Sequence, residues 1–156
     1  MKRRNEMISE DNILDLGKII MSEASIGNQT EKIIVAQTVL NRMKRNNKDK
    51  VKDVWNGYAH NQSPTSEIKE LSRRILLGEV NDISQGATHF YSPRSMPKEG
   101  ESTKGYDVGG GLEQTPGLGN KNYKPSWSLT FERIFNDDVR EIYYKFYKAP
   151  GNGPVS

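Results

Sequence analysis

The sequence predicts an α+β fold, mainly helical, in one domain with a small extended segment and a long glycine-rich loop. Three stretches with apolar residues at helical spacing predict the helices, and the aromatic stretch "GATHFYSP" predicts the extended segment. Residues 94–126 are too rich in glycine and proline for a regular element, and such long loops are usually functional or disordered. We expect a folded domain over residues 10–148, between flexible segments at 1–9 and 149–156.

The first predicted helix covers residues 10–24. Ser9 can cap this helix, and two acidic residues follow in its first turn, where the helix dipole favours negative charge. Glu23 follows Leu16 by seven residues and Ile20 by three. Because this spacing returns to the same helix face, we expect the Glu23 side chain to lie along the buried apolar stripe.

The second predicted helix begins after Gly27, which interrupts the first pattern. Asn28, with Glu31 three residues later, has the form of a capping box. The apolar residues that follow keep helical spacing to about residue 45.

Two later segments complete the prediction. A third helix follows Ser63-Pro64 and ends near Gly78. Residues 136–148 could form a last helix, although their β-branched and aromatic content leaves strands open.

The composition limits the classes of function. The chain has no cysteine, which excludes disulfides, thiolate metal sites and a cysteine nucleophile. Lys and Arg number 23 against 20 Asp and Glu, a mild excess that favours any anionic polymer. No apolar run approaches the roughly 20 residues that span a bilayer, and the opening "MKRRNEMISEDNILDLGKII" lacks the apolar core of a secretory signal. We expect no membrane span.

Several reaction classes lack their motifs. There is no HExxH pattern, and the two histidines, His60 and His89, lie in different segments, so a metal hydrolase is weakly supported. The GxSxG and GxxxxGK[ST] motifs are absent. The stretch "VGGGLEQTPGLG" does not join a strand to a helix, so a flexible loop is its simplest interpretation. We expect neither a metal nor a cofactor.

A partly buried carboxyl group at Glu23 has a specific chemical use. Its apolar neighbours Ile19 and Ile20 reduce the hydration of the charged form, so its pKa should rise and the group could donate a proton to a leaving oxygen. Glycoside cleavage uses a carboxylic acid in this way. The simpler alternative is a solvated or hydrogen-bonded glutamate at a helix end.

Two stretches carry motifs in a particular order. The first contains Glu23-Ala24, Gly27 and Val39-Leu40-Asn41-Arg42. The second, "SEIKELSRRILLGEVNDISQGATHFYSP", contains a Leu-x-Gly helix end, then Gly-Ala, an aromatic pair and Pro. Together, over roughly residues 12–95, they resemble the cell-wall hydrolase family typified by the spore cortex-lytic enzyme SleB.

The resemblance implies a lysozyme-like fold and cleavage of the MurNAc–GlcNAc glycan of peptidoglycan. Members commonly act as lytic transglycosylases with one essential Glu, and that role corresponds to Glu23. The family usually continues with Arg-Gly-Glu, whereas this chain has Ser25-Ile26-Gly27-Asn28, so a second acid near Glu23 is missing. Hydrolysis normally needs a second acid, and the distant candidates are Glu31, Asp82, Asp107 and Glu113.

Sugar binding needs flat apolar faces and amide groups. The candidates of these types are Tyr58, Asn61, Gln62, His89, Tyr91 and Trp127. Core packing is the alternative for Trp127 and Tyr91; we favour it for Trp127 and favour the binding groove for Tyr91. His89 either donates to the developing oxyanion or caps a loop carbonyl. Asn41 and Arg42 either orient Glu23 or tie the second helix to a loop.

Three functions remain open. The first is a monomeric peptidoglycan glycosidase that acts at the bacterial cell wall, delivered by a phage or effector route or trimmed of a leader. The second is a nucleic-acid-binding module, suggested by "MKRR" and "NRMKRNNKDKVK"; these basic residues alternate with Asp and Asn and carry no recognised motif, so we expect no nucleic acid. The third is an inactive wall-binding module.

Overall fold

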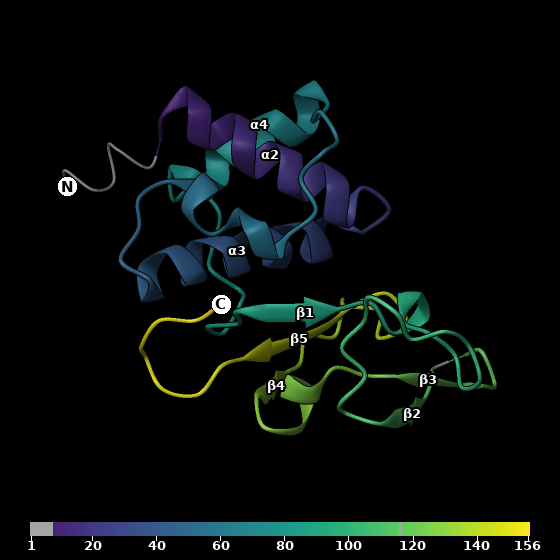
Figure 1. Cartoon of the computed structure of the whole chain (residues 1–156). Coiled ribbons are helices and arrows are strands. Elements are labelled where there is room, and N and C mark those ends of the chain that lie inside the picture. The colour runs from purple at the N-terminus through teal and green to yellow at the C-terminus, as the bar shows by residue number, and fades with distance from the viewer. Residues whose placement is uncertain (1–7, 116) are drawn as a thin grey trace. The chain divides into compact units, whose positions relative to one another are not determined.

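The structure is a computed structural model that describes residues 8–115 and 117–156 (Figure 1). The described chain combines helices with short antiparallel strands, so the predicted α+β class is confirmed. It divides into two compact units. We call the described residues up to Thr88, with Asn152–Ser156, the helical unit, and His89–Gly151 the sheet unit. The predicted flexible segment 1–9 lies outside the described residues except for its last two positions.

The helical unit contains three α-helices among its described residues: α2 (Glu10–Ala24), α3 (Gln29–Arg45) and α4 (Ser66–Leu76). The predicted capping box of α3 is confirmed, because Asn28 and Glu31 exchange two hydrogen bonds of 2.9 Å. The cap of α4 is Thr65, whose side chain accepts a hydrogen bond from the Ile68 N–H. None of the helices in the described ranges is both long and apolar enough to cross a bilayer.

The core of the helical unit forms where α2 packs against both α3 and α4 (Figure 1). Leu16, Ile19 and Ile20 on α2 are fully buried, as are Ile34 and Val39 on α3. Burial of each such side chain contributes about 1.5–3 kcal/mol to folding. The apolar stripe predicted from the sequence is therefore the face on which the unit is built.

Two asparagine side chains, at Asn12 and Asn46, bind the backbone of segments that pass near the helices. The Asn12 side chain on α2 donates to the Asp49 carbonyl oxygen at 2.8 Å and accepts from the Val51 N–H at 2.9 Å. At the end of α3, the Asn46 side chain makes the same pair of bonds with the backbone of Val155, at 2.8 and 2.7 Å. The segment 149–156, predicted to be flexible, is hydrogen-bonded to the helical unit at this point.

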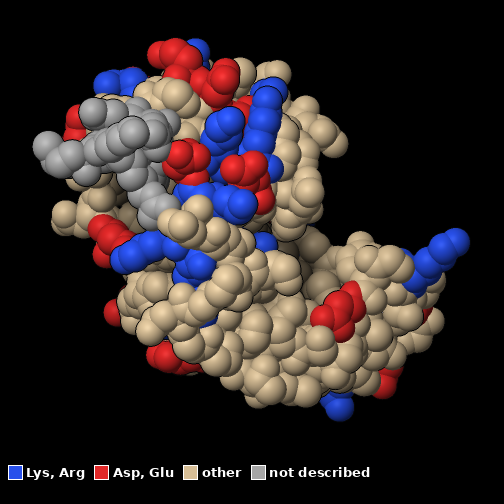
Figure 2. Space-filling view, turned by 60° about the vertical axis from the view of Figure 1, so that its left-hand side comes forward, with Lys and Arg blue, Asp and Glu red and all other residues tan. Residues whose placement is uncertain are grey.

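Charges of both signs are mixed on the face of the molecule that Figure 2 shows. Opposite charges also pair at α4, where Arg73 and Glu70 form an ion pair of 2.6 Å, and just beyond its end, where Glu79 lies 3.8 Å from Arg74.

The sheet unit contains two small antiparallel sheets. Strands β1 (His89–Tyr91), β5 (Lys145–Lys148) and β4 (Glu132–Ile134) form the first in the order β1-β5-β4. Strands β2 (Leu112–Gln114) and β3 (Lys121–Tyr123) pair with each other in the second. The extended segment predicted at "GATHFYSP" corresponds to β1.

Of the two alternatives left open for residues 136–148, the helix is wrong and a strand is found over Lys145–Lys148. Residues 137–143 form turns, and the chain then continues as β5, the central strand of its sheet. Phe146 of β5 is paired with both Phe90 and Ile134 and is 1% exposed. Aromatic residues fit such a pleated, packed surface, and tertiary pairing of this kind overrides the weak helical spacing of the sequence.

The predicted irregular loop over residues 94–126 is wrong in part, because it contains β2 and β3. A Cβ atom at Gly110 would overlap the Pro125 carbonyl oxygen, and Gly110 donates a hydrogen bond to the Lys124 carbonyl at 2.9 Å. The glycine thus permits two backbone segments to approach closely. The glycine content of residues 94–126 indicated a flexible loop, but at Gly110 the structure uses glycine to let two backbone segments pack closely.

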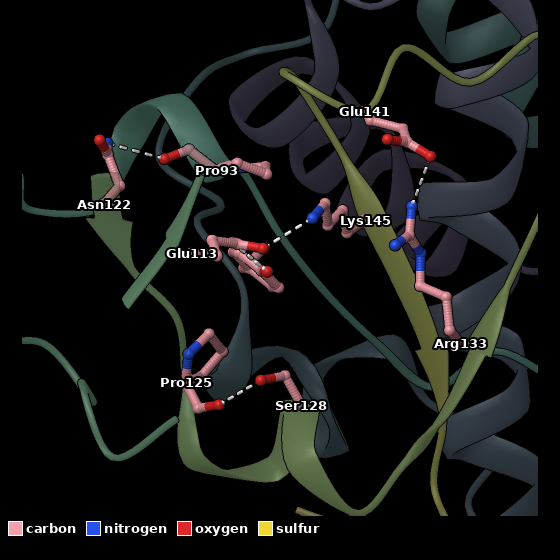
Figure 3. A network of polar contacts seen from close by, with 9 residues as sticks. Pro93, Glu113, Asn122, Pro125, Ser128, Arg133, Glu141 and Lys145 are labelled. Carbon is pink, nitrogen blue, oxygen red and sulfur yellow. Dashed lines mark hydrogen bonds and ion pairs between the residues drawn. The ribbon is translucent and has the colours of Figure 1, made fainter. Parts of the chain in front are cut away.

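A polar network joins three strands of the sheet unit (Figure 3). Glu113 on β2 accepts hydrogen bonds from the Tyr91 hydroxyl on β1 at 2.5 Å and from the Lys145 ammonium on β5 at 2.6 Å. The buried Asn122 side chain on β3 donates to the carbonyl oxygens of Pro93 and Met96, at 3.1 and 2.9 Å. These contacts hold the β2–β3 hairpin on the three-stranded sheet.

The capping box gives a test of the local fold. We expect Asn28→Ala to lower the free energy of unfolding by about 1 kcal/mol, because it removes the acceptor for the Glu31 N–H at the start of α3. Urea denaturation followed by circular dichroism measures the change. Asn28→Ser keeps an acceptor and is the matched control; equal stability of the Ala and Ser variants would contradict the role of the cap.

Candidate functional site

Glu23 is the next-to-last residue of α2, at the end of its buried face. Its side chain is half-buried, and its Oε2 atom accepts a hydrogen bond from the Ala59 N–H at 3.0 Å. One residue earlier, the Ser22 hydroxyl accepts from the Gln62 N–H at 2.9 Å. The loop over residues 59–62 is thus bound to the end of α2 by two backbone donors, one of which holds the carboxylate.

Arg42 on α3 supplies a positive charge to this site. The residue is 8% exposed, and its Nε atom donates to the Thr88 carbonyl oxygen at 2.6 Å. Its guanidinium lies 4.8 Å from the centre of the Tyr58 ring. Because a buried cation needs several partners, the carbonyl and the aromatic ring fix the position of the guanidinium.

The environment of Glu23 shifts its pKa upward. Burial disfavours the charged form and raises the pKa, while the Ala59 N–H and the Arg42 charge lower it by smaller amounts. The upward shift predicted from the sequence is therefore found. A carboxyl group with a raised pKa keeps its proton to higher pH than an ordinary glutamate, which suits proton donation.

Tyr58 is a buried support of the site. It is 5% exposed, its hydroxyl lies 3.0 Å from the Thr38 hydroxyl, and burial raises its pKa to about 12. The ring therefore packs beneath Arg42 as a neutral phenol.

Of the other groove candidates in this unit, Asn61 and Gln62 have exposed side chains in the loop that holds Glu23.

The two supporting candidates tie α3 to the chain before β1. Asn41 donates to the Ser84 hydroxyl at 2.9 Å and to the Ala87 carbonyl at 2.7 Å. Arg42 makes the corresponding bond to Thr88. Of the two roles weighed for this pair, the structural one is found for both residues, and Arg42 also acts on the charge of Glu23.

The remaining groove candidates belong to an aromatic cluster of the sheet unit. His89 is buried, and its ring centre lies 5.2 Å from that of Trp127. Tyr91 packs 5.8 Å from Trp127 and 6.0 Å from Tyr147, and burial and the hydrogen bond to Glu113 raise its pKa. Trp127 is half-buried, and its ring also packs against those of Phe131 and Tyr147.

Each of the four distant acids considered as a second catalytic group is already hydrogen-bonded. Glu31 accepts from the Asn28 N–H in the capping box. Asp82 accepts from the N–H and hydroxyl of Ser84, and Asp107 from those of Ser126. Glu113 accepts from Tyr91 and Lys145. All four carboxylates stabilise local structure as acceptors.

One element of the site was missed by sequence reasoning. The rings of Trp55 and His60 stack with their centres 3.9 Å apart and their planes at 7°. The two residues stand five apart in an aromatic-rich loop, but nothing in the sequence indicates that their rings meet. The stack adjoins Ala59, which donates to Glu23.

Comparison with known proteins gives no match: no protein-family model, curated protein or solved structure is significantly similar to the chain. In the described residues, no three His, Cys, Asp or Glu side chains come together as a possible metal site. The chemistry of the site therefore has to be inferred from Glu23 and its surroundings.

The pKa of Glu23 can be measured directly. We expect carboxyl NMR titration to give a value above the ordinary 4.5, because burial outweighs the Ala59 N–H and Arg42. Since folding then favours the protonated form, the wild-type free energy of unfolding should fall as the pH rises from about 4.5 through the folded-state pKa. Glu23→Gln lacks this titrating group, so the free energy of unfolding of the variant, relative to that of the wild type, should increase over the same pH interval. If the difference between the two proteins does not change with pH, the raised pKa is contradicted.

Proposed function

We propose that this protein is a peptidoglycan-cleaving glycosidase with a lysozyme-like fold, in which Glu23 is the catalytic acid. The observation that carries the proposal is the environment of this carboxyl group: it ends a buried helix face, accepts from the Ala59 N–H at 3.0 Å, and has a pKa raised by burial. The resemblance of its flanking motifs to the cell-wall hydrolase family supports the choice of glycan. The site of action would be the bacterial cell wall.

The first step needs a protonated carboxyl group. Glu23 donates its proton to the glycosidic oxygen while the sugar ring flattens toward an oxocarbenium ion. The C–O bond breaks, the leaving sugar keeps the proton, and Glu23 becomes a carboxylate. The Ala59 N–H and the Arg42 charge then stabilise the ionised form, because both favour negative charge at this position.

We assign the second step to lytic transglycosylation, because that reaction needs one carboxylate and hydrolysis normally needs two. Ionised Glu23 takes the proton of the muramyl 6-hydroxyl, whose oxygen attacks the anomeric carbon and closes an anhydro ring. One carboxylate serves both steps. A hydrolase would normally need a second acid, and Glu31, Asp82, Asp107 and Glu113 are all engaged as acceptors in local structure.

The reaction class is tested with purified peptidoglycan. We expect wild-type protein to release anhydromuropeptides, detected by mass spectrometry, and Glu23→Gln to reduce the rate by about 10²–10⁴-fold because it removes the proton donor. Glu67→Gln makes the same chemical change at an exposed position on α4 and should leave the rate unchanged.

Other outcomes would identify the alternatives. Products with reducing ends would indicate hydrolysis and a second acid still to be found. Wall binding without any fragments would indicate an inactive binding module. A salt-sensitive DNA complex that survives Glu23→Gln, with no wall cleavage, would indicate a nucleic-acid-binding module.

Arg42 is expected to act on the reaction through the pKa of Glu23. Arg42→Met removes the positive charge that lowers this pKa, so the alkaline limb of the kcat/KM profile should move to higher pH. Arg42→Lys retains the charge and should keep the limb near its wild-type position. A loss of rate in Arg42→Met without any displacement of the profile would show that the residue is only structural.

A further inference from the structure

We infer that the stacked pair Trp55 and His60 is the sugar-binding platform of the Glu23 site, which takes the apolar face of an N-acetylhexosamine ring. This inference rests on the proposed function for its ligand. It adds two binding residues that the sequence did not indicate, and it assigns the substrate contact to the helical unit itself.

The platform is held rigid by two contacts. The His60 ring lies flat on the Trp55 indole, at 3.9 Å between centres and 7° between planes. Its Nδ1 atom is 2.9 Å from the Tyr58 carbonyl oxygen. Because a carbonyl oxygen can only accept, Nδ1 carries the hydrogen, and a neutral ring then has its acceptor lone pair at Nε2. One face of the imidazole is thus occupied by Trp55, and the ring presents a polar edge at Nε2.

The platform is one residue away from the group that holds the acid. Ala59 donates its N–H to Glu23, and His60 follows immediately. Gln62, two residues further, is bound through its N–H to Ser22, the residue before Glu23. The segment that carries His60 therefore begins at the end of α2, beside Glu23. The His60 ring itself acts on the charge of Asp15, about two turns earlier on the same helix, so the platform would extend the site along α2.

The choice of these rings follows from the aromatic content of the unit. The described residues of the helical unit contain Trp55, Tyr58 and His60 and no other aromatic side chain. Tyr58 is 5% exposed, and its ring is covered by Arg42. Trp55 and His60 are both partly exposed. His60 occupies one face of the Trp55 indole, and the Lys52 ammonium lies 5.6 Å from the centre of the same ring, so the contact with a sugar falls mainly on the His60 ring and the exposed part of Trp55.

The neighbouring side chains suit the same ligand. Asn61 and Gln62 are exposed directly after His60, and their amides can pair with the hydroxyl and acetamido groups of the sugar. A flat apolar face beside a few polar groups is the usual composition of small-molecule binding sites. The wall glycan presents such C–H faces and acetamido groups along its whole length.

Fluorescence can report the platform directly, because the chain has two tryptophans. In the double variant Glu23→Gln, Trp127→Phe, the remaining tryptophan is Trp55 and cleavage is suppressed. The probes are chitotetraose and peptidoglycan glycan strands freed of their peptides. We expect a saturable change in Trp55 emission with both.

Variants of His60 separate the role of the ring face from other effects. In this background His60→Ala should weaken glycan binding by about 3–10-fold, because it removes the stacking face. His60→Phe restores a flat ring and should retain most of the affinity. Phe135→Ala removes an aromatic ring that is 66% exposed in the sheet unit and should have no effect. Circular dichroism checks that each variant is folded.

The outcomes distinguish the two proposals. A Trp55 response to glycan without any cleavage by wild-type protein would reject the glycosidase and retain the platform. Wall cleavage that depends on Glu23, with a flat Trp55 signal or unchanged affinity in His60→Ala, would reject the platform and retain the glycosidase. In the active background, His60→Ala should raise KM more than it lowers kcat, and the reverse would also count against a binding role.

Discussion

Burial of one face of α2 is the constraint on which the helical unit depends. Leu16, Ile19 and Ile20 have no exposed surface because α3 and α4 both pack on that face. The face continues to the end of the helix, where the position three residues after Ile20 is occupied by an acid. A carboxyl group located at the end of this buried apolar face loses part of its hydration, whatever the function of the residue. The position of Glu23 is thus a consequence of packing, and its chemistry is a consequence of its position.

The site is a balance of opposed electrostatic effects. Burial raises the pKa of Glu23, whereas a backbone donor and a nearby guanidinium lower it. Arg42 can serve in this way because its own burial is offset by the Thr88 carbonyl and the Tyr58 ring. Burial is the largest of the three effects, so the net result is a raised pKa. The buried residues around the carboxyl group therefore set its affinity for a proton.

The sheet unit uses its charged groups differently. Glu113 and Lys145 are nearly enclosed, and the Tyr91 hydroxyl completes the set of donors to the carboxylate. Removing one partner from such a network leaves a buried charge without compensation, so the three groups act together to hold β1, β2 and β5. The same residue types that suggest catalysis in a sequence therefore stabilise a hairpin here. Burial and partners distinguish the two uses, and these are properties of the tertiary structure.

Local signals in the sequence were sufficient for α2, α3 and α4. The capping box at Asn28, the apolar spacing of α2 and the position of Glu23 on its buried face all depend on residues close together in the chain, and each was predicted. Among the strands, the local sequence indicated β1, whereas β2, β3 and β4 were not indicated and β5 was not distinguished from a helix. Lys145–Lys148 becomes β5 because it pairs with two segments that are distant in the sequence: Phe146 lies opposite Phe90, 56 positions earlier, and opposite Ile134, 12 positions earlier. The contacts of Glu23 with Ala59 and of Trp55 with His60 also depend on how a loop closes on the end of a helix.

The sequence by itself thus determined the helices and the acid, because helix formation and amphipathic burial follow short-range spacing. Only the tertiary structure decided the partners of that acid, because hydrogen bonds and ring contacts between distant segments leave no periodic signal.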